Sequence, residues 1–405
     1  MGTCITGCGK AQPGLVVKNE SLEKIVDTSD EWIFSRTGIK ERRISIKESS
    51  LDLAEAACLK ALGMPEPVLD EEITVDFSGK ASKAIKPEEI DLIVLTTVTP
   101  DTLVPSTAAA LKKRLGATNA IAFDMNAACT GFIYGLSIAE SMMAASNCKV
   151  NGGTNMPPIK HALIVSSERL SRLTDWQDRN TCVLFGDGAG AMAIEWSDDE
   201  NDVLSMYLEN TDDDGNSLTC IQSYDSPLPF NDDGVIFNED AMRAHREANP
   251  DAKNVDYSYI ASLGLSCDPA KERIYDEFDI DKIDGDGSPS QSIFMNGQKV
   301  FKFASKAMEH AVREAARLAD VDVDDIDLIV PHQANFRIIE YAAKRLDIPM
   351  DKFQIAIAHT GNTSSSCLPM ALCDAYVEGR ISCGSTVCLV AFGGGLTAGS
   401  AIIRF

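Results

Sequence analysis

The sequence predicts a layered α/β protein that contains a duplicated unit. Residues 89–94 (EIDLIV) recur 236 residues later as residues 325–330 (DIDLIV). A glycine-rich segment, residues 185–190 (FGDGAG), recurs in part 207 residues later as residues 392–395 (FGGG). Two repeats in the same order favour duplication over coincidence, and strands that alternate with helices in each unit predict layered α/β packing.

The individual elements follow from local composition. Residues 92–95 and 162–165 are short apolar runs rich in branched side chains, which is typical of strands buried on both faces. Helical stretches lie between them at residues 107–115 and 131–145. The second stretch is apolar nearly all round, so we predict a buried helix.

Three polar stretches rich in Asp, Asn, Gly and Pro interrupt this pattern, at residues 63–84, 147–160 and 212–290. Such composition favours surface loops, so we interpret them as insertions. The chain then divides into an N-terminal half (1–200), a variable region with the long acidic insertion (201–290) and a C-terminal half (291–405).

Composition excludes several classes of function. The formal net charge of −24 argues against nucleic acid as a partner, because phosphate binding needs a basic surface. No apolar run approaches the roughly 18 residues that a membrane span needs. No basic segment followed by an apolar run opens the sequence, so we expect a cytosolic protein without a secretory signal. The twelve cysteines lack metal-ligand spacing, which predicts no metal. In a long chain without a secretory signal we expect reduced thiols and not disulfides.

Cys129 is the candidate nucleophile. It follows an apolar strand predicted at residues 120–123 and precedes the buried helix predicted at 131–145. The N-terminal end of a helix favours thiolate over thiol, so we expect the pKa of Cys129 to be lowered. A buried structural cysteine is the alternative interpretation.

Two residues of the second half could act on the same substrate. His332 follows the second copy of the repeated strand, at the end where α/β layers often hold catalytic groups. Asn362 lies in a small polar segment ahead of an apolar helix that begins near Leu368, where an N-cap or turn role is the alternative. Cys129, His332 and Asn362, taken together and in this order, favour a catalytic set.

The sequence resembles the β-ketoacyl-acyl-carrier-protein synthase III family, the initiating condensing enzymes of dissociated fatty-acid synthesis. The resemblance covers nearly the whole chain outside the three polar stretches. It rests on segments 27–33 (DTSDEWI), 36–39 (RTGI), 127–129 (AAC), 185–190 (FGDGAG), 332–335 (HQAN), 361–364 (GNTS) and 392–395 (FGGG). It implies the thiolase fold, in which two similar α/β halves pack as a five-layer αβαβα sandwich, and this fold accounts for the repeats.

The same resemblance implies roles for single residues. Cys129, His332 and Asn362 form a catalytic triad, and the backbone N–H groups of Cys129 and Gly394 form an oxyanion hole. The implied contacts of coenzyme A at the mouth of a tunnel are Thr28, Trp32, Arg36, Arg179 and Gly297. No cofactor is implied, because the coenzyme A thioester is a substrate.

These residue types suit a decarboxylative Claisen condensation between acyl-coenzyme A and malonyl-acyl carrier protein. A thiolate at Cys129 can accept the acyl group, because exchange between thioesters is nearly isoenergetic and sulfur leaves well. Loss of carbon dioxide then places negative charge on a thioester oxygen. His332 and Asn362 can both donate hydrogen bonds to that enolate, and each such donor is worth roughly 10²–10³ in rate.

The resemblance further implies a homodimer and a docking site for the acidic carrier protein. Arg337 is the expected anchor, with Lys302, Lys344 and Arg345 as neighbours.

Val104 stands where the family closes the acyl tunnel of the partner subunit, often with phenylalanine. The smaller valine favours a longer or branched primer, unless Leu103 or the insertions refill the space and keep acetyl preferred.

Two other interpretations remain open. Another thiolase-fold condensing enzyme, similar to chalcone synthase or hydroxymethylglutaryl-coenzyme A synthase, could act in polyketide or related metabolism, although segments 30–32 and 36–38 favour the initiating synthase. A non-catalytic binding member is the second, although such proteins lose the nucleophile and Cys129 is present.

Overall fold

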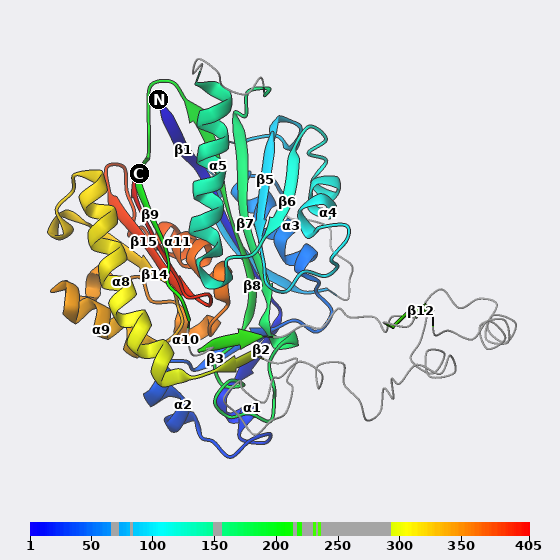
Figure 1. Cartoon of the computed structure of the whole chain (residues 1–405), viewed down its shortest axis with the longest axis vertical. Coiled ribbons are helices and arrows are strands. Elements are labelled where there is room, and N and C mark those ends of the chain that lie inside the picture. The colour runs from blue at the N-terminus through cyan, green and yellow to red at the C-terminus, as the bar shows by residue number, and fades with distance from the viewer. Residues whose placement is uncertain are drawn as a thin grey trace, which may run out of the picture. The chain divides into compact units, whose positions relative to one another are not determined.

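The computed structural model describes residues 1–65, 73–81, 84–148, 156–213, 217–220, 230–231, 234–235 and 293–405. The chain divides into two units, one formed by residues 1–218 and 295–405 and the other by residues 219–294. The first unit holds a six-stranded sheet, a four-stranded sheet and the helices that cover them, together with a small two-stranded sheet (Figure 1). In the second, β11 (Phe230–Asn231) and β12 (Gly234–Val235) form an antiparallel ribbon. The domain boundaries at residues 200 and 290 stay a prediction.

The first sheet contains six strands, in the spatial order β4 (Val75–Ala81), β1 (Gly2–Pro13), β8 (Asp187–Ser197), β7 (His161–Arg169), β5 (Leu92–Thr96) and β6 (Ile121–Met125). Strand β5 is parallel to both β6 and β7, and the remaining pairs are antiparallel. The predicted strands at 92–95, 120–123 and 162–165 are thereby confirmed.

The second sheet contains four strands, in the order β14 (Leu328–Pro331), β15 (Thr386–Gly393), β16 (Thr397–Arg404) and β9 (Val203–Asn210). Strands β14 and β15 are parallel, and the next two pairs are antiparallel. The succession β5-β7-β8-β1 in the first sheet has the same pattern of one parallel pair followed by two antiparallel pairs. The predicted duplication is therefore visible in the topology.

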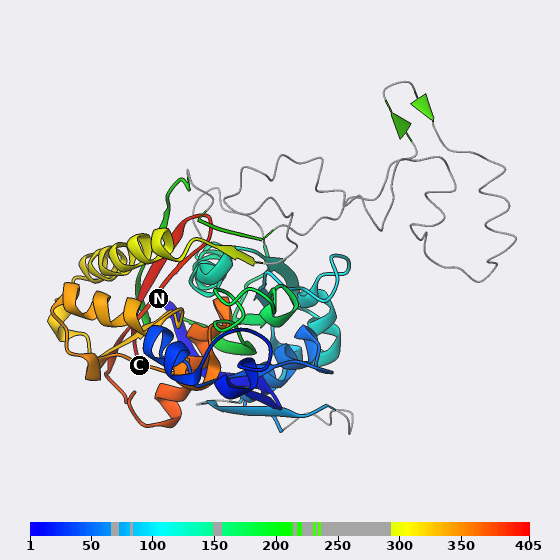
Figure 2. The ribbon, with the colours of Figure 1, turned by 90° about the horizontal axis from the view of Figure 1, so that it is seen from below.

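Helices form three layers around the two sheets. The outer face of the first sheet is covered by α3 (Ser50–Ala61) and α4 (Thr107–Leu115), and that of the second by α8 (Gly297–Ala319) and α9 (Phe336–Leu346). Between the sheets lie α5 (Gly131–Asn147) and α11 (Cys367–Val377). Figure 1 shows the outer helices at opposite sides, and Figure 2 shows the same succession from below. This is the predicted five-layer αβαβα arrangement.

The central helix α5 is largely buried, as its composition predicts, although one face stays open: Ile138 is 36% exposed. Phe132, Ile133, Leu136 and Met143 are fully buried in the apolar core between the sheets. Burying such a side chain contributes about 1.5–3 kcal/mol, so this helix is a main source of cohesion between the two sheets.

Shorter elements complete the description. Ser29 caps α2 (Asp30–Thr37), accepting a hydrogen bond from the Trp32 N–H at 3.1 Å. The others are β2 (Leu15–Lys18), β3 (Glu41–Ile44), α1 (Asn19–Leu22), α10 (Ile357–Thr360), β10 (Leu218–Cys220) and β13 (Ile293–Met295), with single 3-10 turns at Pro87–Glu89, Ala128–Thr130, Leu170–Arg172, Val323–Asp325, Met350–Lys352 and Ser364–Ser366.

The polar stretches follow the prediction only in part. Residues 75–81 form the edge strand β4, which pairs antiparallel with β1, so this part of stretch 63–84 belongs to the sheet and not to a surface loop. Val75 and Phe77 alternate with polar residues, which is the period of a strand. Residues 149–155 of stretch 147–160, and most of stretch 212–290, lie outside the described residues.

No helix in the described ranges is long and apolar enough to cross a membrane. In the same part of the chain, no group of three or more His, Cys, Asp or Glu side chains is arranged to hold a metal ion.

Candidate active site

Cys129 lies in a 3-10 turn, η2 (Ala128–Thr130), that joins β6 to α5. Ala128 has a φ of 46°, a left-handed conformation that costs a non-glycine residue roughly 1–3 kcal/mol. The Thr130 hydroxyl fixes the turn by donating to the Ala127 carbonyl at 2.6 Å and by bonding to Thr397 Oγ1 at 2.8 Å. Tertiary contacts from the second half therefore hold the nucleophile in a strained turn.

The thiol of Cys129 is not the activated thiolate that the sequence led us to expect. Burial among protein atoms raises its pKa to about 11, although the hydrogen bond from Ser364 Oγ to Sγ (3.5 Å) acts in the opposite direction. The prediction of a lowered pKa from the helix N-terminus is thus wrong, because desolvation of the charged sulfur outweighs the helix. The surrounding protein atoms therefore favour the neutral thiol form, although the side chain of Cys129 is only partly buried.

His332 directly follows β14 and has 1% of its surface exposed. Its Nδ1 lies 2.8 Å from Cys367 Sγ, and the ring packs edge-on against Phe392 with centroids 5.1 Å apart. Burial lowers the pKa of His332 to about 3, so the ring is neutral at physiological pH. A neutral imidazole carries a single N–H, and Nε2 has no hydrogen-bond partner among the described residues.

Asn362 connects the two halves of the molecule. Its backbone N–H donates to the Leu184 carbonyl at 2.8 Å, and its carbonyl accepts the Gly186 N–H at 3.0 Å. In the side chain, Oδ1 accepts the Ser364 N–H at 2.9 Å. The amide nitrogen Nδ2 is left as a donor without a protein partner in the described part of the chain.

Segment 362–367 brings the three predicted catalytic residues together. It contains Asn362 itself, Ser364, which contacts Cys129, and Cys367, which contacts His332. One short segment of the second half thus reaches the nucleophile on the first half and the histidine on its own half.

Sequence reasoning missed three supporting residues. Ser364 lies in segment 361–364, on which the family resemblance rests, but that resemblance implies no role for it. Cys367 carries no sequence signal that separates it from a core cysteine. Glu168 is fully buried at the end of β7, where it accepts hydrogen bonds from Ser365 Oγ (2.9 Å) and Thr99 Oγ1 (2.8 Å). Burial raises the pKa of Glu168 to about 7. The sequence does contain a signal for Glu168, because it places a carboxyl group just after the buried strand predicted at residues 162–165.

The predicted coenzyme A contacts are partly gathered around one indole. The guanidinium carbons of Arg36 and Arg179 lie 4.7 Å and 4.9 Å from the Trp32 ring centroid. Thr28, just before α2, has a buried hydroxyl with no hydrogen-bond partner among the described residues. Gly297 opens α8, where an added Cβ would meet no atom within 4 Å. Three of the five residues therefore form a cationic and aromatic cluster.

The predicted docking cations differ in how they are engaged. Arg337 is exposed at the start of α9, where its Nε donates to the Ser35 carbonyl of α2 at 3.1 Å, and Lys302 is exposed on α8. Two others form ion pairs, Lys344 with Glu340 at 3.4 Å and Arg345 with Glu309 at 2.5 Å. Pairing with carboxylates reduces what Lys344 and Arg345 can offer to an acidic partner.

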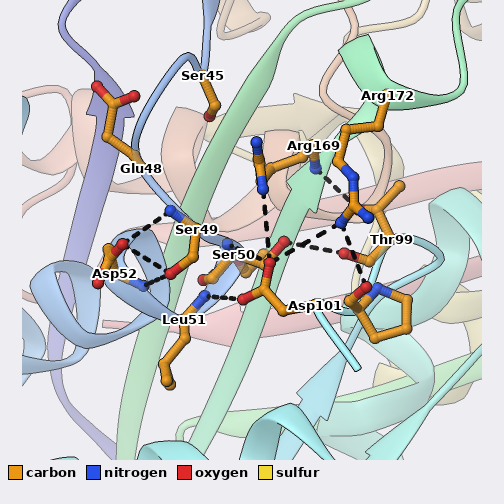
Figure 3. Close-up of polar contacts among 12 residues, drawn as sticks. Ser45, Glu48, Ser49, Ser50, Leu51, Asp52, Thr99, Asp101, Arg169 and Arg172 are labelled. Carbon is orange, nitrogen blue, oxygen red and sulfur yellow. Dashed lines mark hydrogen bonds and ion pairs between the residues drawn. The ribbon is translucent and has the colours of Figure 1, made fainter. Parts of the chain in front are cut away.

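The loop that carries Val104 is fixed at its base by Asp101. The Asp101 carboxylate accepts the N–H groups of Ser50 (3.0 Å) and Leu51 (2.9 Å) at the N-terminus of α3. Arg169 and Arg172 place guanidinium nitrogens 3.6 Å and 3.9 Å from the same carboxylate (Figure 3). Beyond this anchor the loop projects, because Leu103 and Val104 are 57% and 88% exposed.

The turn between β15 and β16 lies against the backbone of the nucleophile. A Cβ added to Gly393 would stand 2.8 Å from the Cys129 backbone nitrogen, so this close approach needs glycine. The neighbouring Gly394 tolerates a Cβ at ordinary contact distance from Leu218. An oxyanion hole formed by the N–H groups of Cys129 and Gly394 stays a prediction.

Alkylation of Cys129 tests the effect of burial. We expect the rate of iodoacetamide labelling at Cys129, read by site-resolved mass spectrometry, to rise about tenfold per pH unit between about pH 7 and 10, because the thiolate fraction grows in that proportion below the pKa. In the native protein the hydrogen bond from Ser364 lowers the pKa of Cys129. Ser364→Ala should therefore raise this pKa and slow labelling at each pH. Exposed Cys383 serves as the internal labelling control. A plateau already at about pH 8 would contradict a dominant role of desolvation.

Comparison with known proteins gives full-length matches. Two family profiles match the chain, one described as 3-oxoacyl-[acyl-carrier-protein (ACP)] synthase III at residues 123–212 and its C-terminal counterpart at residues 316–405. The β-ketoacyl-[acyl-carrier-protein] synthase III of Clostridium acetobutylicum is 38% identical over 401 residues, which cover 99% of this chain and 98% of that protein. The protein of the same name from Xanthomonas euvesicatoria is 36% identical over 403 residues, covering 99% and 98%.

Solved structures agree. The 3-oxoacyl-[acyl-carrier-protein] synthase III of Aquifex aeolicus is 34% identical with a TM-score of 0.74, covering 100% of both chains. The priming β-ketosynthase of the R1128 polyketide pathway is 27% identical with a TM-score of 0.72, covering 99% of this chain and 96% of that one. The chain therefore has the thiolase-like fold and belongs to the 3-oxoacyl-[acyl-carrier-protein] synthase III family, acyltransferases that carry out the initiating condensation of fatty-acid synthesis.

Proposed function

We propose that this enzyme condenses an acyl-coenzyme A primer with malonyl-acyl carrier protein through an acyl-Cys129 intermediate. The observation that supports this best is segment 362–367, which brings Asn362 and contacts to Cys129 and His332 into one buried place. The family assignment supplies the reaction class, and the residue roles are those that the family resemblance implies. A cytosolic location remains a prediction from the sequence.

In the first half-reaction, the sulfur of Cys129 attacks the acyl carbonyl of the primer. The carbonyl oxygen becomes an oxyanion, to which the N–H groups of Cys129 and Gly394 would donate. The carbon–sulfur bond to coenzyme A then breaks, and the proton lost from Cys129 ends on the departing coenzyme A thiol. The Trp32, Arg36 and Arg179 cluster suits the nucleotide of coenzyme A, because it combines cations for phosphates with an aromatic face.

In the second half-reaction, malonyl-acyl carrier protein loses carbon dioxide and its thioester becomes an enolate. The donors at hand are His332 Nε2 and Asn362 Nδ2, which have no protein partners in the described part of the chain. Because the pKa of His332 is lowered to about 3, the histidine acts as a neutral N–H donor and not as a cation. The enolate carbon attacks the acyl-Cys129 carbonyl, and Cys129 leaves as thiolate. This thiolate takes up a proton from water, which restores the thiol and replaces the proton carried away by coenzyme A.

Substitutions in the triad should separate the two half-reactions. Cys129→Ser should abolish acyl-enzyme formation, measured by intact-protein mass spectrometry after addition of acetyl-coenzyme A. His332→Ala or Asn362→Ala should retain acylation and lower malonyl decarboxylation by roughly 10²–10³, since each removes one enolate donor. Condensation at wild-type rate in Asn362→Ala would show that the triad is wrongly assigned, and absence of any adduct in the wild type would remove the proposed function.

Docking of the acidic carrier protein at Arg337 is supported by the exposure and position of this residue. Arg337 contacts the carbonyl of Ser35 on α2, the helix that also carries Trp32 and Arg36. A carrier protein bound there would lie beside the expected entrance for coenzyme A. The overall charge of −24 makes a local cation necessary for such a partner.

Arg337→Glu should raise the KM for malonyl-acyl carrier protein about tenfold and leave acetyl-coenzyme A loading unchanged, because it replaces attraction by repulsion at the carrier site alone. Lys113→Glu on α4 is the matched control, since it makes the same charge exchange on an exposed residue of the other outer helix layer. The wild-type KM should also rise with salt. Equal damage to both half-reactions in Arg337→Glu would indicate misfolding and refute a docking role.

A homodimer is supported by exposed apolar groups along one edge of the first sheet. Strand β6 is the last of the six strands, and its Ile121 is 44% exposed. Leu103 and Val104 project from the loop anchored at Asp101. Open strand edges and exposed apolar side chains are features that a second subunit can cover. Val104 would then complete the acyl pocket of the partner subunit.

Val104→Phe should depress the use of four-carbon and branched primers by about tenfold and spare acetyl-coenzyme A, because the ring fills space that a longer acyl chain would occupy. Each methylene buried there contributes about 0.8 kcal/mol. A primer screen on the wild type and the variant, with sedimentation to give the oligomeric state, provides the measurement. An unchanged primer profile, or a fully active monomer, would remove this role for Val104.

A further inference from the structure

Cys367 is a buried thiol that contacts the catalytic histidine. It begins α11, directly after the 3-10 turn that carries Ser364, and has 2% of its surface exposed. Its Sγ lies 2.8 Å from His332 Nδ1 and accepts the backbone N–H of Gln333 at 3.3 Å. Neither the triad nor the coenzyme A contacts account for this cysteine.

The backbone around Gln333, whose N–H donates to the Cys367 sulfur, is fixed by hydrogen bonds from the Gln333 side chain. Gln333 donates from Nε2 to the carbonyls of Pro331 (2.7 Å) and Gln354 (3.0 Å). Its Oε1 accepts the N–H groups of Ala356 (2.9 Å) and Ile357 (3.0 Å). With all four contacts formed inside the protein, the Gln333 N–H has little freedom to turn away from the sulfur.

Proton counting separates the two possible arrangements at His332. If Nδ1–H donated to Cys367, the sulfur would accept two N–H groups, and its own S–H would have no acceptor among the described residues. If S–H donates to Nδ1, the S–H of Cys367 and the N–H of Gln333 both have acceptors inside the protein, as buried polar groups require. The proton that then has no protein partner in the described part of the chain is Nε2–H, the donor assigned to the enolate. Burial keeps the pKa of Cys367 well above the usual range of a thiol, so the S–H is present at neutral pH. The second arrangement places the single imidazole proton on Nε2.

We propose that Cys367 is a positioning residue, whose S–H donates to His332 Nδ1 and holds the imidazole as the Nε2–H tautomer. This inference rests on the proposed function, in which Nε2–H and Asn362 Nδ2 donate to the enolate. The edge-on contact with Phe392 restrains the same ring from a second side. Together the two contacts fix both the direction of Nε2 and the proton that it carries.

Half-reaction assays with two variants test the role. Cys367→Ala removes the donor and should lower malonyl decarboxylation about 10- to 100-fold, the usual effect of removing an outer-shell partner. Acylation of Cys129 should stay within about twofold, because it does not need Nε2–H. Cys367→Ser keeps an O–H donor and should restore most of the decarboxylation. Cys58→Ala is the matched control, since it removes an equally buried sulfur from α3. Unchanged decarboxylation in Cys367→Ala overturns the proposal.

The tautomer can be measured without any activity. In ¹⁵N-labelled wild-type protein, protonated and bare imidazole nitrogens of His332 have well-separated shifts, and His332→Ala identifies the signal. We expect the proton on Nε2 in the wild type and in Cys367→Ser. A proton on Nδ1 in the wild type overturns the proposal even if Cys367→Ala fails to fold. Acyl-enzyme formation by the wild type tests the proposed function separately, so failure of one is distinguishable from failure of the other.

Discussion

The pair of backbone hydrogen bonds between Asn362 and the strand-like segment 184–186 is the constraint on which the site depends. It fastens a segment of the second half against the half that carries the nucleophile. The approach is close: a Cβ on Gly186 would stand 2.2 Å from the Thr360 carbonyl oxygen, and Gly361 has a φ of +64° with its Cβ position 2.9 Å from the Leu184 carbonyl oxygen. Glycine at both positions is therefore a physical requirement for bringing Asn362, Ser364 and Cys367 to the nucleophile and the histidine.

A polar site between two sheets must satisfy its own hydrogen bonds, and this requirement organises the residues behind the triad. Glu168 connects Ser365, next to the catalytic segment, with Thr99, at the base of the loop that leads to Val104. The loop and the catalytic segment are thus fixed to the same buried carboxyl group. Glu168, Ser365 and Thr99 have hydrogen-bond partners inside the protein. In the described ranges, His332 Nε2 and Asn362 Nδ2 do not, and these two donors are the ones assigned to the substrate.

The fold could be predicted from sequence because duplication leaves a repeated pattern and buried strands are apolar on both faces. The bounds of α4 and the strand before His332 follow from such local patterns. Strand β4 was missed because polar composition masked its alternation. Depth in the fold is a tertiary property, so the helix start after Cys129 was visible while the desolvation that raises its pKa was not. The contact of Cys367 with His332 joins residues 35 positions apart, and no local signal marks it.

The protonation states at the site bear on how one geometry serves two reactions. Transfer of an acyl group from one thiol to another needs no net proton acceptor, since the proton lost by Cys129 is regained by coenzyme A. A neutral His332 therefore does not have to act as a base in the first step and as a donor in the second. It can keep its proton on Nε2 throughout, which a buried ring with a pKa of about 3 is suited to do. Desolvation raises the pKa of Cys129 and lowers that of His332, so the same physical effect favours the neutral form of both groups.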